Sequence, residues 1–382
     1  MTDRLFDNGM LFDFDARVIS CKPAKRGFEV VLDRSAFFFE GGGQAADTGT
    51  ISDARVIDVR DRCGETVHIT DRALTVGSTV HGTIDRNVRF RRMQEHTGEH
   101  LLTGIIHRKF GYNNVGFHLG SECVLLDLDG ALTADELRIC ELEANRIIGE
   151  DRRVTITYPT ADELQALDYR SKLELTENVR IVTIEDCDAC ACCAPHVPST
   201  GMIGMVKVIS SENYKGGTRI RLLCGLDALD DYNRRLDAVY AVSRTLSAKP
   251  DRIAEHVERL ADENSALKYR IGELECERAA DITASLTNES RRSFCIFIGS
   301  MNSDIARSIA NYGVTLTDGV FGLFMASGEG YSYIMASESV DMREVAKKMN
   351  AALSGKGGGS GTMVQGSVKA QRRDIEDFFG RI

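Results

Sequence analysis

Long apolar runs are missing from this sequence of 382 residues. No stretch approaches the ~20 consecutive apolar residues that a helix needs to cross a bilayer, which argues against a helical membrane protein. The N-terminus, from Met1 to Asp15, carries four aspartates and no apolar core, so it does not read as a secretory signal peptide. We therefore expect a cytoplasmic protein without a membrane partner.

An excess of positive charge is also missing, since the formal net charge is −10. This argues against a protein that coats nucleic acid through bulk electrostatics. It leaves room for a local basic face, because attraction to phosphates acts over about 8–10 Å. Arg86, Arg89, Arg91 and Arg92 form one such cluster. The cluster is either a basic patch or the solvated, salt-bridged start of a helix.

Length and composition predict several domains, because 382 residues exceed one ordinary core while 43% apolar and 27% charged residues are typical of soluble globular proteins. Short apolar or alternating runs, punctuated by Gly, Asp and Pro, predict a small N-terminal β-barrel in residues 1–85. Residues 86–226 mix helical and strand patterns, which favours an α+β domain. The whole chain is therefore expected to be α+β and multidomain.

The character of the sequence changes after Leu226. In residues 227–290 apolar side chains recur at heptad spacing, and Pro250 suits the first turn of a second helix. This helical coiled-coil segment would form a hairpin or a dimer seam, or an amphipathic helix packed on its own domain. Residues 291–382 predict a compact C-terminal α/β domain. Its glycine-rich stretch from Gly355 to Gly366 lacks the spacing of a phosphate-binding Walker loop.

Two short motifs carry the candidate chemistry. His96-Thr97-Gly98-Glu99-His100 runs into an apolar pattern with helical spacing, which places both imidazoles one turn apart on one face. Cys192-Cys193-Ala194-Pro195-His196 contains a proline and is expected to be a turn or loop. Each half alone would be unremarkable. Together, His96, His100, Cys192 and His196 form a nitrogen and sulfur ligand set suited to one Zn²⁺ per chain.

These motifs resemble those of a known family. Residues 93–102 resemble the first zinc motif of the alanyl-tRNA editing proteins called AlaX, the free-standing relatives of the alanyl-tRNA synthetase editing domain. Residues 192–204 resemble the second motif and the strand after it. The family's usual Cys-Gly-Gly-Thr-His is Cys-Cys-Ala-Pro-His here. The spacing of the two ligands is kept, but the small, flexible residues between them are replaced. Residues 355–366 resemble the end of the DHH-associated domain of long AlaX proteins, so the resemblance covers nearly the whole chain.

The resemblance implies a function. A long-form AlaX protein would hydrolyse the ester that joins serine or glycine to tRNA specific for alanine. It would act in trans without charging tRNA, because no synthetase catalytic domain precedes the barrel. Zinc would orient the substrate if all four side chains bind it at once, since no tetrahedral position then stays open. The expected partners are mischarged tRNA and a second copy bound through the C-terminal half.

The resemblance also places further site residues. The family carries a Gly-Gly-Gly-Gln stretch beside its pocket, although successive glycines alone would be typical of an ordinary turn. His118 occupies a place where the family keeps a polar residue at the pocket wall. Gln94 and Thr97 bracket His96 and would donate hydrogen bonds or cap the helix, and Asp127 would orient a ligand imidazole or end its strand. We expect substrate-binding residues at Gly41, Gly42, Gly43, Gln44 and Asp127, and catalytic residues at Gln94, Thr97 and His118.

The eleven cysteines support a rival interpretation. Their crowding between Cys187 and Cys193 suits a thiolate metal site in a reducing cytosol better than a disulfide framework. Cys187, Cys190, Cys192 and Cys193 would close a structural metal site, or Cys187 and Cys190 would act as a redox pair. The protein would then be a zinc-stabilised, non-catalytic RNA-binding or assembly protein.

Overall fold

A computed structural model describes residues 2–120, 122–171, 179–286 and 293–382. The chain forms two compact units, Met1–Tyr240 and Ala241–Ile382. The boundary predicted between residues 290 and 291 lies outside the described residues, and the division into four domains stays a prediction. Of the helices that the structure describes, none is both long enough and apolar enough to cross a membrane.

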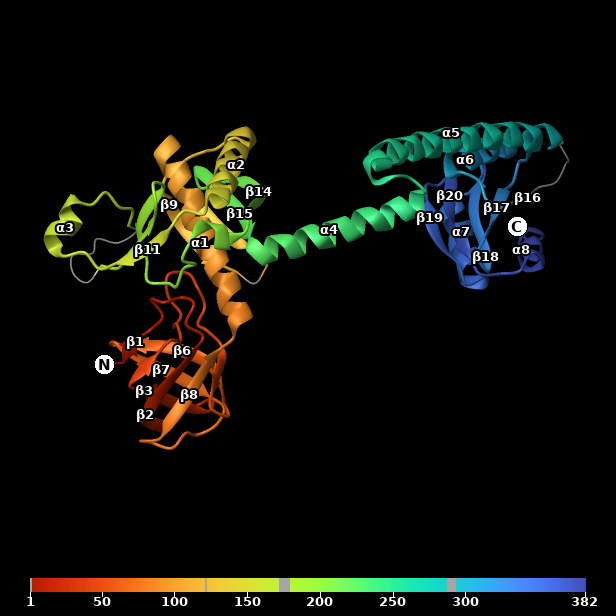
Figure 1. Ribbon diagram of the computed structural model, residues 1–382. Coiled ribbons are helices and arrows are strands. Elements are labelled where there is room, and N and C mark those ends of the chain that lie inside the picture. The colour runs from red at the N-terminus through yellow and green to blue at the C-terminus, as the bar shows by residue number, and fades with distance from the viewer. Residues whose placement is uncertain (1, 121, 172–178, 287–292) are drawn as a thin grey trace. The chain divides into compact units, whose positions relative to one another are not determined.

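The first unit begins with a closed antiparallel barrel in the order β2-β3-β7-β6-β5-β8 (Figure 1). Its strands are β2 (Asp13–Pro23), β3 (Phe28–Leu32), β5 (Gly49–Ile51), β6 (Ala54–Arg62), β7 (Glu65–Thr70) and β8 (Thr79–Ile84), and β1 (Asp3–Arg4) pairs with β4 (Arg34–Ser35). Along β2, Phe14, Ala16 and Val18 are buried and alternate with exposed neighbours, because successive side chains of a strand point to opposite faces. The β-barrel predicted from the sequence is confirmed.

Helix α1 (Arg86–Phe110) follows the barrel directly. The carboxylate of Asp85 caps its start by accepting a hydrogen bond from the backbone N–H of Val88 at 3.2 Å. Gly111 ends the helix in the left-handed conformation, with φ of 73°. Every residue from Met93 to Ile106 is buried, so the middle of α1 lies in the core of the first unit.

Two antiparallel sheets and a second helix pack around α1 (Figure 1). The sheets have the orders β14-β15-β10-β9 and β11-β12-β13. The elements are β9 (Asn114–Leu119), β10 (Val124–Leu128), α2 (Ala134–Glu150), β11 (Val154–Thr157), α3 (Ala161–Ala166), β12 (Ile181–Ile184), β13 (Asp188–Ala191), the 3-10 helix η1 (Thr200–Ile203), β14 (Val206–Tyr214) and β15 (Gly217–Cys224). This arrangement brings β13 and the loop after it against α1.

The predicted helical segment is present as α4 (Gly225–Leu246), η2 (Pro250–Arg252) and α5 (Ile253–Ser285). Pro250 occupies the first turn, as its fixed φ favours. The heptad residues of α5 are exposed in the single chain, among them Leu260, Leu267 and Ile271. The pairing of these helices in a coiled coil therefore stays a prediction.

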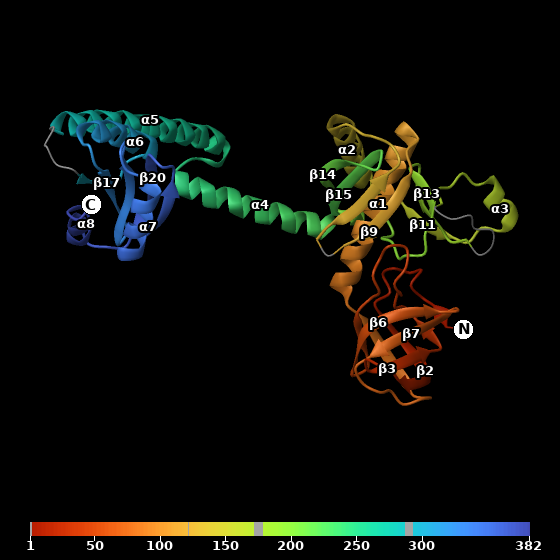
Figure 2. The ribbon, with the colours of Figure 1, turned by 180° about the vertical axis from the view of Figure 1, so that it is seen from behind.

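The second unit contains a five-stranded sheet in the order β16-β17-β18-β20-β19. Its remaining elements are β16 (Phe294–Ile298), α6 (Ser303–Gly313), η3 (Val314–Leu316), β17 (Phe321–Ser327), β18 (Gly330–Ala336), α7 (Met342–Ala352), β19 (Lys356–Gly359), β20 (Met363–Val368) and α8 (Arg372–Phe379). One core lies between the sheet and α5 with α6, and a second between the sheet and α7 with α8 (Figure 2). Only β16 and β17 pair in parallel, so this region is closer to α+β than to the α/β class expected.

Candidate metal centre

Helix α1 carries the first pair of candidate ligands. His96 and His100 lie one turn apart, with ring centroids separated by 5.3 Å, and both side chains are buried. The second pair, Cys192 and His196, lies in the loop after β13. Arg180 holds that loop in place, because its guanidinium donates to the carbonyl oxygens of Cys192 at 2.7 Å and of Ala194 at 2.9 Å.

The structure brings the four predicted ligands together. One donor atom from each of His96, His100, Cys192 and His196 lies within 4.8 Å of the others. The Cys192 Sγ atom is 3.5 Å from Nε2 of His96 and 3.4 Å from Nε2 of His196. Three imidazoles gathered around one thiol form a nitrogen and sulfur donor set that is compatible with tetrahedral zinc.

Two imidazoles have hydrogen-bond partners at Nδ1, the ring nitrogen away from Cys192, and these partners show whether the residues fit a metal. Nδ1 of His96 lies 3.0 Å from Oε1 of Gln44, and Nδ1 of His196 lies 3.0 Å from Oγ1 of Thr97. An amide oxygen can only accept, so Gln44 keeps the proton of His96 on Nδ1 and leaves Nε2 free to bind a cation. The residues present therefore fit a zinc ion.

The electrostatics of the cluster favour a thiolate. Burial alone raises the pKa of Cys192, but the neighbouring imidazole of His96 and hydrogen bonds from His100 and His196 outweigh it, so the pKa lies well below its ordinary value. Burial lowers the pKa of His196 to about 3, which keeps that imidazole neutral. Thiolate and neutral imidazole are the forms that bind metals.

The glycine-rich turn lies beside this cluster. Gly41 and Gln44 exchange two backbone hydrogen bonds of 3.0 Å, while Gly42 and Gly43 adopt positive φ values of 59° and 81°. A Cβ atom on Gly43 would stand 2.5 Å from the ring of Phe117, so only glycine lets the turn approach that ring. Gln44 is fully buried, and its Nε2 donor has no hydrogen-bond partner among the described residues.

Several residues of the centre were not predicted from the sequence. The ring of Phe117 packs 4.8 Å from that of His96 and forms one wall. Asp188 of β13 lies beside His100, with Oδ2 of the carboxylate 3.7 Å from Nδ1 of the imidazole. A signal was available for Asp188: in an extended strand Asp188, Cys190 and Cys192 share one face.

Of the basic cluster at the start of α1, Arg89 is buried, Arg91 and Arg92 are half-buried and Arg86 is exposed. Arg89 is fully buried, and its Nε donates to both carboxylate oxygens of Asp47 at 2.9 Å. Arg91 pairs with Asp227, and Arg92 donates to the carbonyl oxygen of Ala46 at 2.6 Å. The salt-bridged alternative therefore describes Arg89 and Arg91. Through Asp47, Arg89 also joins α1 to the segment that follows the glycine-rich turn.

Three residues predicted to act at the site have contacts or positions of a different kind. The amide of Gln94 donates to the carbonyl oxygens of Met202 and Ile203 at 3.0 and 3.2 Å, which ties α1 to η1. His118 is exposed on the edge strand β9. Asp127 accepts two hydrogen bonds from Arg219, at 2.7 and 2.8 Å. Asp188, rather than the predicted Asp127, thus lies beside Nδ1 of the candidate ligand His100, and Oε2 of Glu99 lies 3.9 Å from Nε2 of the same ring.

The remaining cysteines do not gather into one thiolate cluster among the described residues. Cys190 belongs with His100 and Asp188 to a second group whose donor atoms lie within 4.8 Å of one another. Burial raises the pKa of Cys187 to about 11. Cys193 points at the glycine-rich turn, where Cβ atoms on Gly41 and Gly42 would stand 3.5 and 3.4 Å from its Sγ.

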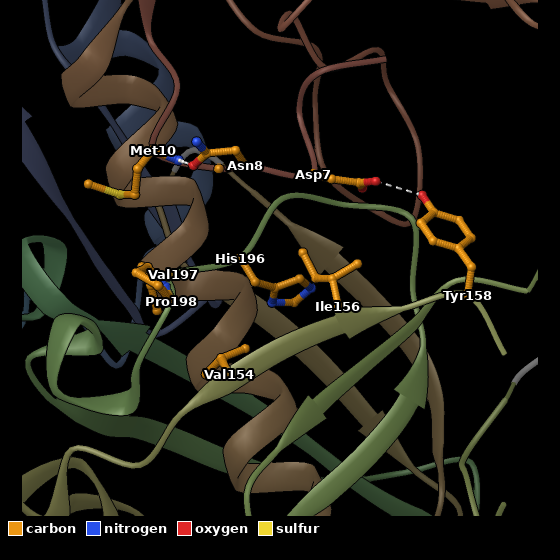
Figure 3. A pocket seen from close by; sticks show the side chains of 10 residues that line it. Asp7, Asn8, Met10, Val154, Ile156, Tyr158, His196, Val197 and Pro198 are labelled. Carbon is orange, nitrogen blue, oxygen red and sulfur yellow. Dashed lines mark hydrogen bonds between the residues drawn. The ribbon is translucent and has the colours of Figure 1, made fainter. Parts of the chain in front are cut away.

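A cavity of about 310 Å³ lies on another side of His196 (Figure 3). Residues 7–10 form one wall, and β11 with Tyr158 forms another. The hydroxyl of Tyr158 donates to Asp7 at 2.9 Å across it. Since Asp7 also accepts from Arg180 at 2.7 Å, the N-terminal loop is linked to the ligand loop.

The chain is similar to known proteins of tRNA aminoacylation and editing. Residues 179–221 match the family described as the threonyl and alanyl tRNA synthetase second additional domain, and residues 10–88 match the class II (A) tRNA synthetases. The AlaX-L editing protein of Pyrococcus horikoshii is 28% identical over 99% of this chain and 97% of its own length. The Aarsd1 editing protein of Bos taurus is 29% identical over 72% of this chain and 66% of its own.

Alanine–tRNA ligases match over part of their length. The ligase of Ignicoccus hospitalis is 31% identical over 71% of this chain, which spans only 31% of that ligase. A solved C-Ala domain from the Aquifex aeolicus alanyl-tRNA synthetase matches 23% of this chain and 89% of its own length at 18% identity, with a TM-score of 0.20. With two matched families and a relative aligned over 99% of this chain, the chain is similar to the alanyl-tRNA editing proteins.

Proposed function

We propose that this protein is a zinc-dependent hydrolase that removes serine or glycine from tRNA specific for alanine. The observation that carries the proposal is the convergence of His96, His100, Cys192 and His196 beside the buried amide of Gln44. Relatives that are named alanyl-tRNA editing proteins support the substrate class. A zinc ion held by the four side chains would supply Lewis-acid polarisation or, with all four bound, orientation of substrate polar groups.

The reaction is hydrolysis of an ester. Water adds to the carbonyl carbon, the bond from that carbon to the terminal ribose oxygen breaks, and the ribose oxygen takes up a proton. Gln44 is suited to assist, because its Oε1 holds His96 while its Nε2 remains a donor for a substrate oxygen. Phe117 packs against His96 and Cys193 lies against the glycine-rich turn, and both would limit the access of bulk water.

Selectivity needs a group that recognises what alanine lacks. A site that hydrogen-bonds a substrate hydroxyl can reject an analogue without it by ~10⁴ or more. Thr97 already accepts from the backbone N–H of Val197 at 3.2 Å and contacts His196, so we assign it the support of His196. The free donor of Gln44 is the better partner for the hydroxyl of serine.

The remaining predicted residues are assigned by their surroundings. The backbone of Gly41, Gly42 and Gly43 would line the aminoacyl end of the substrate. His118 is next to Leu119, whose backbone N–H donates to Gly43 at 3.0 Å, so its exposed ring is a candidate contact for the tRNA end. Gln94 and Asp127 are assigned structural roles instead.

The test is a comparison of seryl-, glycyl- and alanyl-tRNA with the full chain. We expect seryl- or glycyl-tRNA to be deacylated at least about tenfold faster than alanyl-tRNA, and removal of zinc by a chelator to abolish the difference. The control is each aminoacyl-tRNA alone, since these esters hydrolyse spontaneously. Equal rates on all three tRNAs, or no rate above the control, would refute the proposal.

A further inference from the structure

The three imidazoles of the metal centre differ in one respect. Those of His96 and His196 each have a side-chain oxygen 3.0 Å from Nδ1. His100 is equally buried, yet its Nδ1 has no hydrogen-bond partner among the described residues. Oδ2 of Asp188 lies 3.7 Å from that atom, beyond a normal hydrogen bond by less than one ångström.

Asp188 is held firmly in this place. Arg170 donates to it twice, from Nε to Oδ1 and from Nη2 to Oδ2, both at 2.7 Å. The same guanidinium donates to Oγ1 of Thr103 on α1 at 3.0 Å. A fork that grips a carboxylate and a helix together fixes the carboxylate against that helix.

A glycine on α1 lets Asp188 come close to His100. Gly104 follows His100 by one helical turn, so the two positions lie on the same face. A Cβ atom on Gly104 would stand 2.6 Å from Cβ of Asp188. Any larger residue at this position would therefore push Asp188 away from His100.

We propose that Asp188, clamped by Arg170, is the positioning residue of His100 and accepts its Nδ1–H when Nε2 binds the metal. This inference rests on the metal centre of the proposed function, but not on the substrate. Each imidazole would then have its own support: Gln44 for His96, Thr97 for His196 and Asp188 for His100. Such partners orient the ring and raise its basicity.

Another use of Asp188 is less compatible with its contacts. His100, Asp188 and Cys190 could in principle hold a second cation. Both carboxylate oxygens of Asp188 already accept from Arg170, however, and the guanidinium charge beside them would repel that cation. The geometry therefore favours a hydrogen bond to His100 over a second ion.

The test uses the full chain, with Zn²⁺ and Co²⁺ as probes. Asp188→Asn keeps the size of the side chain and removes its charge. We expect it to weaken Zn²⁺ affinity by about 10- to 100-fold, measured by competition with a chromophoric chelator, and to change the visible absorption of the Co²⁺ form. Asp127→Asn is the matched control, because Asp127 is gripped by Arg219 through the same two-point contact, and it should change affinity less than about twofold.

A spectroscopic readout separates positioning from general stability. In the zinc-loaded protein, Asp188→Asn should move the Nδ1–H proton resonance of His100 and leave those of His96 and His196 in place. Unchanged zinc affinity in Asp188→Asn, or an equal loss in Asp127→Asn, would overturn the inference. Failure of the parent protein to bind zinc would instead remove the metal centre itself, and the inference with it.

A second variant keeps the test decisive if Asp188→Asn does not fold. Arg170→Lys retains the positive charge but cannot grip both oxygens. With an unchanged circular dichroism spectrum, we expect it to weaken Zn²⁺ affinity by about threefold or more. A folded Arg170→Lys protein with the affinity of the parent would contradict the role of the clamp.

Discussion

At the scale of single residues, the metal centre is organised by the oxygen atoms behind its ligands as much as by the ligands. Gln44, Thr97 and Asp188 come from three separate segments, and each lies behind a different imidazole. The ligands themselves are 96 residues apart in the chain, measured from His96 to Cys192. Two predictions follow from these contacts.

Removal of the thiol should empty the site. Cys192→Ala is expected to lower Zn²⁺ affinity at least tenfold, because ligands act jointly and the thiolate is the softest of the four. Atomic emission on protein purified without added metal measures the loss. Cys193→Ala is the matched control and should retain about one zinc per chain; retention by Cys192→Ala as well would refute the ligand assignment.

The oxygen and the nitrogen of the Gln44 amide should have separable roles. Gln44→Glu keeps an oxygen that can accept from Nδ1 of His96 and removes the Nε2 donor. We expect zinc content to stay at the parent level while kcat/KM on seryl-tRNA falls by about 10²-fold, the usual cost of losing one buried donor at a reacting centre. A variant as active as the parent would show that Nε2 does not contact the substrate.

At the scale of elements, the barrel contains a buried titratable group that the metal centre does not use. His68 of β7 is fully buried, 2.8 Å from Oγ of Ser35 and 3.1 Å from the carbonyl oxygen of Val30. Burial lowers its pKa from 6.5 to about 4. The folded barrel therefore resists protonation that the unfolded chain accepts.

This difference makes the barrel sensitive to acid. Above pH 6.5 His68 is neutral in both states, and the free energy of unfolding should fall as the pH drops from 6.5 toward 4. Between pH 7 and pH 5 we expect a loss of about 2 kcal/mol from this residue. Urea unfolding followed by circular dichroism should show that His68→Gln removes this part of the pH dependence. His81→Gln, on the exposed face of β8, should keep it; an identical dependence in parent and His68→Gln proteins would contradict the assignment.

At the scale of the whole molecule, α5 carries exposed apolar side chains at heptad spacing, among them Leu260, Leu267 and Leu274. We expect a second copy to cover them, because apolar residues repeated at this spacing are typical of paired helices. Leu267 is 63% exposed, and Leu142 of α2, outside this set, is 62% exposed. Light scattering should show a dimer for the parent and for Leu142→Glu, and a monomer for Leu267→Glu. A monomeric parent would rule out the dimer.

The local features of this protein were predictable because they depend on neighbours in the chain. The spacing of His96 and His100 sets them on one helical face, and alternation along residues 13–18 identifies the inner face of the barrel. The Cys192 and His196 pair is likewise local, and together with the first pair its spacing predicts a candidate ligand set. The barrel and the grouping of these four side chains were accordingly predictable from the sequence, and their binding of zinc stays a prediction.

Tertiary structure decided what surrounds those ligands. The sequence pattern left Asp127 either orienting an imidazole or ending its strand. It left the cluster with Arg89 either a basic patch or the salt-bridged start of a helix. Packing places Asp188 beside His100 and buries Arg89 against Asp47. Contacts between segments so far apart depend on the register of β13 and on the absence of a side chain at Gly104. The sequence around a charged residue looks the same whether its side chain faces solvent or pairs with a distant residue in the core. The partner is determined only when the chain folds.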